Sequence, residues 1–306
     1  MSLTPGVAQT RAGNTKAPAT PTPTRQRSGR SSHWGATAIL VLGALYCLLP
    51  VLWVLIASTK TPGQLFTTFS FSPSFTGGLT GNIRGLLDFK DGLFLRWAAN
   101  TVLYAGVGAL LTVFVSAAAG YGMAKYRFAG RELIFRLILA GVLIPQVTLA
   151  IPQYLLLAKV GLVGSYWSVL LPSLISPFSI YLCRVYAMAA VPDELLEAGR
   201  IDGAGEARLF RSVGLPLMLP GLVTVFLLQF VAIWNNFLLP FIMLSDDSRF
   251  PMTVGLYALL NQGASQPALY TLVITGSMLS ILPLIALVLL LQRYWRLDLL
   301  SGGLKG

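Results

Sequence analysis

The residues that could do chemistry are concentrated in one segment, residues 191–221. Only 11% of the 306 residues are charged, yet this segment carries five carboxylates and three arginines. These residues are Asp193, Glu194, Glu197, Arg200, Asp202, Glu206, Arg208 and Arg211. A carboxylate such as that of Glu197 can form a charge-assisted hydrogen bond with an arginine of another protein. The segment therefore indicates recognition of a partner.

The sequence offers little for catalysis. His33 is the single histidine, so a histidine-based metal cluster is excluded. No Gly-Lys-Ser or Gly-Lys-Thr triplet occurs, and the chain therefore has no P-loop to hold phosphates. We expect no enzyme, no metal site and no cofactor in this chain. If ATP drives its function, another chain must hydrolyse it.

Local signals predict how the charged segment folds. Pro192 followed by acidic residues is typical of a helix start, because proline suits the first turn and carboxylates favour the positive end of the dipole. Gly203 and Gly205 are predicted to end that helix, which then covers about 192–202. A second helical run leads into Pro216 and Pro220. Such a short helix is marginal alone, so the membrane body or a partner must hold it.

Long apolar runs decide the fold class. The chain is 55% hydrophobic with a mean hydropathy of +0.71, and several runs of about 20 residues could each cross a bilayer core of about 30 Å. The sequence predicts an all-α polytopic membrane protein with six spans. They cover about 34–58, 94–123, 133–158, 166–189, 213–244 and 268–291, with the longest connecting loop at 59–93.

The distribution of basic residues predicts the orientation. With both termini in the cytoplasm, 16 of the 22 Lys and Arg residues fall on the inside, in agreement with the positive-inside rule. This topology explains the net charge of +11 without nucleic acid as a partner. It predicts a multi-pass protein of the cell membrane, with the segment around Glu197 on the cytoplasmic side.

The middles of the spans contain no Asp, Glu, Lys, Arg or His, which argues against proton coupling. Pro145 and Pro152 each precede a glutamine, and seven residues are nearly two helical turns, so Gln146 and Gln153 should share a face. Proline frees a carbonyl that must turn toward protein or water. We interpret both glutamines as pore-lining; helix packing is the alternative.

Further neutral polar residues lie in spans four and five. They are Ser176, Gln229, Trp234, Asn235 and Asn236. Amides bond hydroxyl groups and an indole covers the apolar face of a sugar ring, so this set suits a sugar substrate. The alternative is that the amides link helices to one another.

The charged segment also carries a family resemblance. Glu197-Ala198-Gly199, three residues, Gly203, nine residues and Val213-Gly214-Leu215-Pro216 resemble the EAA loop of permease subunits in binding-protein-dependent ABC importers, with Gly199 and Val213 departing from the usual Ala and Ile. Trp234-Asn235-Asn236-Phe237 resembles MalG-like carbohydrate permeases. The resemblance runs from about residue 34 to the end.

The resemblance implies a six-helix type I permease domain over 33–306, with a coupling loop at about 190–212. It implies a second related permease, an ABC ATPase dimer that binds ATP and Mg, and an extracytoplasmic sugar-binding protein. The residues implied to contact the ATPase are Glu194, Glu197, Ala198, Gly199, Asp202, Gly203, Leu215 and Pro216. Asn261, Gln262 and Gly263 are expected to contact the binding protein.

The sequence supports one more structural prediction and leaves one alternative function open. Residues 1–32 are rich in Thr, Pro, Ser and Arg and are expected to form a disordered cytoplasmic tail. A stand-alone secondary carrier or channel is the alternative function, and it would work without ATP or a partner chain.

Overall fold

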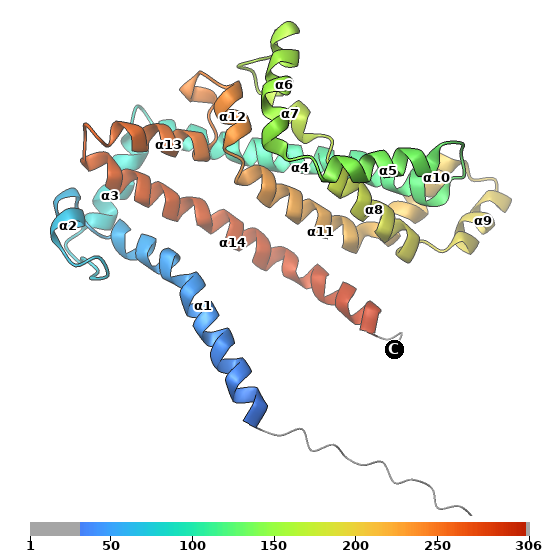
Figure 1. Ribbon diagram of the computed structural model, residues 1–306, viewed down its shortest axis with the longest axis horizontal. Coiled ribbons are helices and arrows are strands. Elements are labelled where there is room, and N and C mark those ends of the chain that lie inside the picture. Colours follow the sequence, from blue (N-terminus) through green and yellow to red (C-terminus); the bar gives the residue numbers. More distant parts are fainter. Residues whose placement is uncertain (1–30, 304–306) are drawn as a thin grey trace, which may run out of the picture. The chain divides into compact units, whose positions relative to one another are not determined.

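A computed structural model describes residues 31–303, and helices are the only regular secondary structure in that range. The chain divides after Leu48, within its first helix, and the part from Leu49 onward forms the main body (Figure 1). The helices are α1 (Ser31–Ser58), α2 (Pro62–Thr67), α3 (Gly78–Asp88), α4 (Leu93–Lys125), α5 (Arg131–Val142), α6 (Gln146–Lys159), α7 (Trp167–Ser173), α8 (Pro177–Ala190), α9 (Asp193–Ile201), α10 (Glu206–Leu209), the π-helical turn η1 (Phe210–Gly214), α11 (Leu215–Trp234), α12 (Leu238–Met243), the 3₁₀ turn η2 (Asp247–Arg249), α13 (Met252–Gln262) and α14 (Ala268–Gly303).

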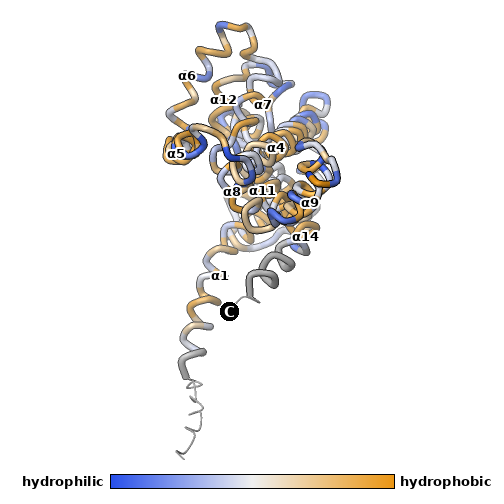
Figure 2. The backbone as a smooth tube through the Cα atoms, turned by 90° about the vertical axis from the view of Figure 1, so that its right-hand side faces the viewer, coloured by the Kyte–Doolittle hydropathy of each residue, from blue (hydrophilic) through white to orange (hydrophobic). Residues whose placement is uncertain are grey.

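Four helical stretches are long and apolar enough to cross a membrane: residues 34–58, 93–125, 206–234 and 268–292. Two bent pairs, α5 with α6 and α7 with α8, raise the number to six if each pair is one span. Hydrophobic residues dominate these helices, as the orange colouring of Figure 2 shows. The fold class is thus the predicted one, an all-helical membrane protein.

Helix α4 is the centre of the main body. It packs along α8 and α11 and contributes residues to all four clusters of buried apolar side chains. Ala105, Ala109 and Ala117 on α4 are fully buried. At Gly120 an added Cβ would lie 2.6 Å from the backbone nitrogen of Arg184 on α8. Small residues let membrane helices approach closely, and close packing is what holds them together in lipid.

The predicted third span is not one kinked helix. The chain bends by 104° between α5 and α6, because it leaves the helix at Leu143 and Pro145 stands in extended backbone as the N-cap of α6. Proline disfavours the helical conformation of the residue before it, which explains the break at this position. Of the two prolines, Pro145 precedes α6 and Pro152 lies inside it. Gln146 and Gln153 therefore both belong to α6, with no break in the helix between them.

Two other predicted spans are interrupted. α7 and α8 are bent by 41° at the segment before Pro177. The fifth span, expected to reach residue 244, ends at Trp234, and the separate helix α12 follows. The three breaks, 143–145, 174–176 and 235–237, each contribute residues to the lining of one cavity.

The long loop predicted at 59–93 contains two short helices, α2 and α3. The expected disordered tail falls largely outside the described residues; its last two residues, Ser31 and Ser32, begin α1.

Candidate functional site

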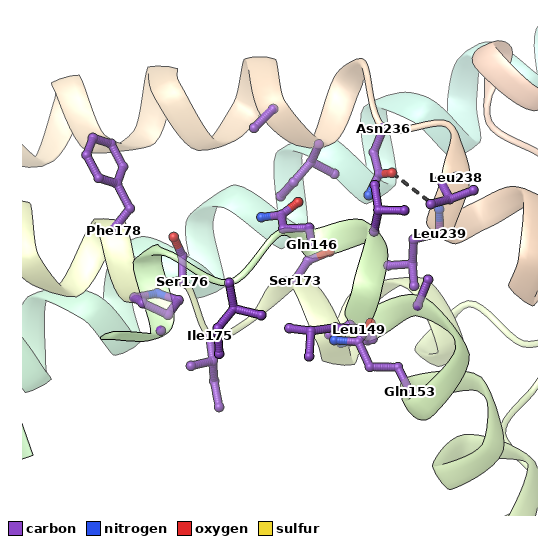
Figure 3. Close-up of a pocket in the computed structure, with 18 of the residues that line it drawn as sticks. Gln146, Leu149, Gln153, Ser173, Ile175, Ser176, Phe178, Asn236, Leu238 and Leu239 are labelled. Carbon is purple, nitrogen blue, oxygen red and sulfur yellow. Dashed lines mark hydrogen bonds between the residues drawn. The ribbon is translucent and has the colours of Figure 1, made fainter. Parts of the chain in front are cut away.

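The three helix breaks surround a cavity of about 290 Å³, here called the break cavity. Its lining residues come from α5, α6, α7, α8, α11 and the start of α12, and none of them is charged. Five of the seven predicted substrate-path residues lie in this lining: Gln146, Gln153, Ser176, Gln229 and Asn236. Figure 3 shows four of them, with Ile175, Leu149 and Leu239 between the polar groups.

The polar side chains of the break cavity differ in what they bond. Gln229 Nε2 donates to Ser176 Oγ at 3.0 Å, and that hydroxyl accepts the Ser179 amide at 3.2 Å as the N-cap of α8. Asn236 Oδ1 accepts the Leu239 amide at 3.4 Å. Within residues 31–303, the amides of Gln146 and Gln153 have no protein hydrogen-bond partner. These two amides are therefore available to a polar solute.

Trp234 and Asn235 are not in this lining. Trp234 is 3% exposed and stacks on Phe230 with ring centroids 5.4 Å apart, so its indole belongs to the core. Asn235 Nδ2 donates to the Val231 carbonyl at 2.8 Å, which closes the end of α11. Both residues border a smaller cavity of about 230 Å³ between α11, α13 and α14.

A second candidate site is the α9–α10 hairpin, residues 193–209. Helix α9 begins with Pro192 as N-cap and ends at Ile201, close to the predicted 192–202. Gly203 has φ +80, the left-handed conformation that lets the chain turn after a helix. Gly205, predicted as a second stop, has φ −72 and is instead the N-cap of α10.

One face of the hairpin is held against the body. Leu196 and Leu209 are 2% and 1% exposed and pack in one cluster with Tyr121 of α4. An added Cβ at Gly199 would lie 2.5 Å from Leu209 Cδ2. The missing side chain at 199 thus makes room for Leu209 inside the hairpin, at a position that the resemblance implied to contact the ATPase.

Ion pairs fix the hairpin at both ends. Lys125 Nζ, at the end of α4, lies 2.7 Å from Asp193 Oδ1, and this pairing lowers the pKa of the Asp193 carboxyl. Arg200 binds the Glu206 carboxylate through two nitrogens, at 2.8 and 3.3 Å. Bidentate pairs fix orientation as well as distance. The hairpin is therefore a pre-formed unit.

The opposite face of the hairpin is open. Glu194, Glu197, Ala198, Asp202 and Gly203 are exposed. Ile201 is 87% exposed and Leu195 is 49% exposed. The outer face of the hairpin therefore combines exposed carboxylates with exposed apolar side chains.

The turn from the hairpin into α11 passes through η1. Leu215 is half-buried and Pro216 exposed at the first turn of α11. Proline has no amide hydrogen and clashes with the carbonyl four residues earlier, Ser212, so regular α-helical bonding cannot pass this point. The π-helical turn over 210–214 is where that misfit is taken up.

Comparisons with known proteins agree with this geometry. Residues 113–296 match the family model described as "Binding-protein-dependent transport system inner membrane component". The arabinooligosaccharides transport system permease protein AraQ of Halalkalibacterium halodurans is 33% identical, over 89% of this chain and 96% of that protein. The lactose transport system permease protein LacG of Rhizobium radiobacter is 30% identical, over 84% and 90%.

The chain belongs to the binding-protein-dependent transport system inner membrane component family. It is a multi-pass inner-membrane permease, and the ATPase is a separate subunit. The fold agrees: the solved structure of a bacterial ABC transporter that imports the acidic polysaccharide alginate superposes with a TM-score of 0.75 at 23% identity, covering 89% of the permease and 99% of that chain.

The end of the permease opposite the hairpin carries the predicted binding-protein contacts. Asn261 and Gln262, at the end of α13, are exposed. Gly263 is buried, and an added Cβ there would lie 3.1 Å from the ring of Tyr270. Gly263 therefore shapes the turn into α14 and presents no side chain of its own.

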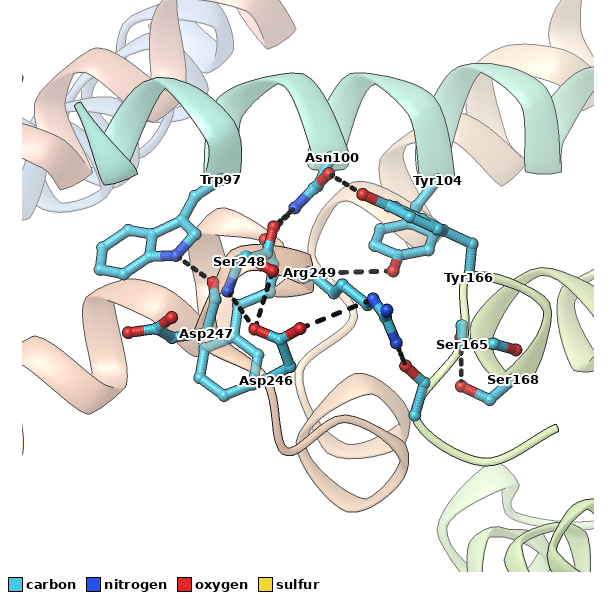
Figure 4. Close-up of polar contacts among 12 residues, drawn as sticks. Trp97, Asn100, Tyr104, Ser165, Tyr166, Ser168, Asp246, Asp247, Ser248 and Arg249 are labelled. Carbon is cyan, nitrogen blue, oxygen red and sulfur yellow. Dashed lines mark hydrogen bonds and ion pairs between the residues drawn. The ribbon is translucent and has the colours of Figure 1, made fainter. Parts of the chain in front are cut away.

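A polar network at this end went unpredicted (Figure 4). It holds the 246–250 turn on α4: Trp97 Nε1 donates to the Asp247 carbonyl at 2.8 Å, and Asn100 Nδ2 donates to the carbonyls of Ser248 and Phe250 at 2.9 and 3.0 Å. Arg249 Nη1 donates to the Gly164 carbonyl at 2.5 Å, which ties the α6–α7 turn to the same place. The spacing of Trp97, Asn100, Thr101 and Tyr104 on one helical face was the available signal.

Proposed function

We propose that this permease forms half of the translocation pore of an ATP-driven importer for oligosaccharides, and that its α9–α10 hairpin is the segment that docks on the ATPase. A stand-alone carrier would need no such hairpin. The observation that carries the proposal is the construction of the hairpin itself: the buried Leu196 and Leu209, together with two ion pairs, hold it in place, while Ile201 and Glu197 stand exposed on its outer face.

The sugar substrate is supported by the break cavity and by the relatives. Relatives at 30–33% identity are named for arabinooligosaccharide and lactose transport. The cavity lining is neutral and combines amides, hydroxyls and apolar side chains, a combination that suits hydroxyl groups on an apolar ring. Gln146 and Gln153 are proposed to contact the passing sugar.

The orientation proposed for the permease puts the hairpin in the cytoplasm. Lys125, Arg127 and Arg131 lie in the α4–α5 connection, and the Lys125–Asp193 pair brings them to the same end as the basic residues of the hairpin. An excess of Lys and Arg marks the cytoplasmic side. Both termini then lie inside, and the α13–α14 turn with Asn261 and Gln262 faces the sugar-binding protein.

The assembly proposed around this chain contains a second, related permease in the lipid bilayer and an ATPase dimer on the cytoplasmic side. The permease contributes one side of the pore, and its ATPase partners bind ATP and Mg. When the ATPase subunits close, the docked hairpin moves with them. Helix α11, which follows the hairpin through η1, then transmits this movement to the residues that line the break cavity.

The docking role is tested with Ile201→Asp in the complete transporter in proteoliposomes. Ile201 is 87% exposed, so the substitution leaves folding unchanged but places a charge in the proposed interface. We expect loss of ATP hydrolysis stimulated by the binding protein, with normal insertion in the membrane. Phe128→Asp is the matched control, since Phe128 is 44% exposed in the neighbouring α4–α5 connection. Equal coupling in both variants would refute the docking role.

The sugar path is tested separately with Gln153→Leu, which keeps the size of the side chain and removes its amide. We expect a lower rate of oligosaccharide uptake with unchanged assembly. Leu156→Ala is the control on the same helix, because Leu156 is 67% exposed and lies outside the lining. Uptake by the purified permease without any ATPase would instead establish the stand-alone carrier.

A further inference from the structure

Residues 61–83, between Lys60 and Arg84, contain no charged side chain. The first part of this segment, residues 61–77, is called here the phenylalanine loop, because it carries Phe66, Phe69, Phe71 and Phe75. Their exposed fractions are 63%, 74%, 37% and 91%. The function proposed above makes no use of this loop.

The loop is ordered by polar contacts that point inward. Thr61 and Gln64 form a capping box at the start of α2. Lys60 is 1% exposed, and its Nζ donates to the Phe69 carbonyl at 2.6 Å. Ser74 completes the interior: its amide donates to Thr59 Oγ1 and its hydroxyl to Gln64 Oε1, both at 2.9 Å.

The loop pairs many of its polar groups internally and turns its phenyl rings outward. Lys60 is buried, the exposed Thr67 and Thr68 donate their hydroxyls to the carbonyls of Gly63 and Gln64, and the phenyl rings face outward. With about 200 Å² for each ring, the exposed parts amount to roughly 500 Å² of apolar surface. An apolar exterior over a satisfied polar interior is what a lipid environment requires of a protein segment.

The position of the loop along the spans supports the same reading. The spanning part of α1 ends at Ser58, three residues before the loop begins. Phe66 packs edge-on against Tyr270 at 5.9 Å, and Tyr270 lies in the first turn of the spanning helix α14. Two span ends therefore fix the loop at the level where the bilayer surface lies, next to the exposed apolar residues Leu52 and Leu55 of α1.

We propose that the phenylalanine loop inserts its rings into the interfacial layer of the lipid bilayer and anchors this end of the permease at a fixed depth. The ligand class is the membrane lipid at the boundary of headgroups and acyl chains. The sugar-binding protein is the competing occupant, because the α13–α14 turn lies at the same end of the molecule.

The test uses the complete transporter in lipid nanodiscs with a spin label at Phe75→Cys, and in a second variant at Phe69→Cys. Cys47 is exposed and is replaced by serine, whereas Cys183 is buried. Ser265→Cys is the control, since Ser265 is exposed at the α13–α14 turn and is not aromatic. Power saturation compares collisions with oxygen, which concentrates in lipid, and with a water-soluble nickel chelate.

We expect oxygen collisions to exceed nickel collisions at 69 and 75 without any binding protein, and the reverse at 265. Nickel collisions exceeding oxygen collisions at both loop positions would overturn the proposal. It would also be overturned if nickel access at 75 were high at first and disappeared only after the binding protein was added, since the loop would then be a protein contact. Neither result depends on whether the hairpin docks on an ATPase.

Discussion

The α9–α10 hairpin and the break cavity are both built where helices are interrupted, but they use opposite chemistry. The hairpin holds three of its charged residues in defined pairs, Lys125 with Asp193 and Arg200 with Glu206, and exposes the others on its surface. The break cavity has no charged residue in its lining and leaves two amides free for a solute. The difference matches the two proposed roles: paired charges orient a segment proposed to transmit movement, whereas neutral groups suit a proposed path that must release its cargo.

The strongest test of this contrast is to place one charge in each region. Gln229→Glu puts a carboxylate into the neutral cavity and removes the donor to Ser176 Oγ. Because a charge within a span costs about 3 kcal/mol, we expect lower thermal stability and loss of uptake. Ala207→Glu, on the exposed surface of the hairpin, should leave the melting temperature unchanged. Similar melting temperatures for both variants would contradict the contrast.

A second test concerns the packing inside the hairpin. Gly199→Val would force a side chain against Leu209 Cδ2, where even a Cβ lies at 2.5 Å. Overpacking of this kind costs about 2 kcal/mol, so we expect displacement of α9 and loss of stimulated ATP hydrolysis by the complex. Gly205→Val is the matched control, because Gly205 has extended backbone and open space around it. Coupling that survives at 199 would mean that the hairpin need not be rigid.

A smaller effect is expected from Ser176→Ala at the break before α8. The hydroxyl caps α8 and accepts from Gln229. Loss of a cap typically costs about 1 kcal/mol, and the freed Gln229 amide should change the uptake rate as well. Ser173→Ala is the comparison: Ser173 also lines the cavity, but its hydroxyl donates to the Val169 carbonyl within its own helix. Equal effects on uptake would remove the special role of the Ser176–Gln229 pair.

Much of the fold could be predicted because hydropathy and proline act locally. The run at 94–123 became α4, and Pro192 with Gly203 bounded α9 almost as expected. The breaks could not be placed from the same signals. Pro145 and Pro152 both precede glutamine, yet one begins a helix after a 104° bend and the other lies within that helix. The proline signal is the same at both positions, so the sequence alone could not show which of the two would break the helix.

For the candidate sites too, local sequence signals could be recognised, but effects of packing could not. Gln146, Gln153, Ser176, Gln229 and Asn236 were recognised as polar residues in apolar runs, and they line one cavity. Trp234 is also a residue with a polar group in an apolar run, but its ring stacks on Phe230 in the core. Which side of α11 faces the cavity depends on how the helix packs against its neighbours. The role of Gly199 was also hidden, since Leu209, which fills the space beside it, is ten residues away in the sequence.

The smallest expected effect comes from pH and concerns only the hairpin. Lys125 donates to Asp193 at 2.7 Å, and this contact holds the pKa of the Asp193 carboxyl below its ordinary value. A lowered pKa stabilises the folded hairpin above the unfolded value of about 3.9 and ceases to do so as the pH falls through the folded value. The anchoring of α9 should therefore be constant from pH 7 to about 5 and weaken below about 4.

Hydrogen exchange of residues 193–201 in the complete transporter measures that anchoring directly. Lys125→Met should raise exchange at neutral pH and remove the part of its acid dependence that comes from Asp193, because the ammonium group that favours the ionised carboxylate is gone. The part that comes from Glu206, whose pKa Arg200 also lowers, should remain. The residues of the break cavity contain no titratable partner of this kind, so exchange in α6 should not follow the same profile. An acid transition of undiminished size in Lys125→Met, or one that appears equally in α6, would show that the Lys125–Asp193 pair does not distinguish the hairpin from the break cavity.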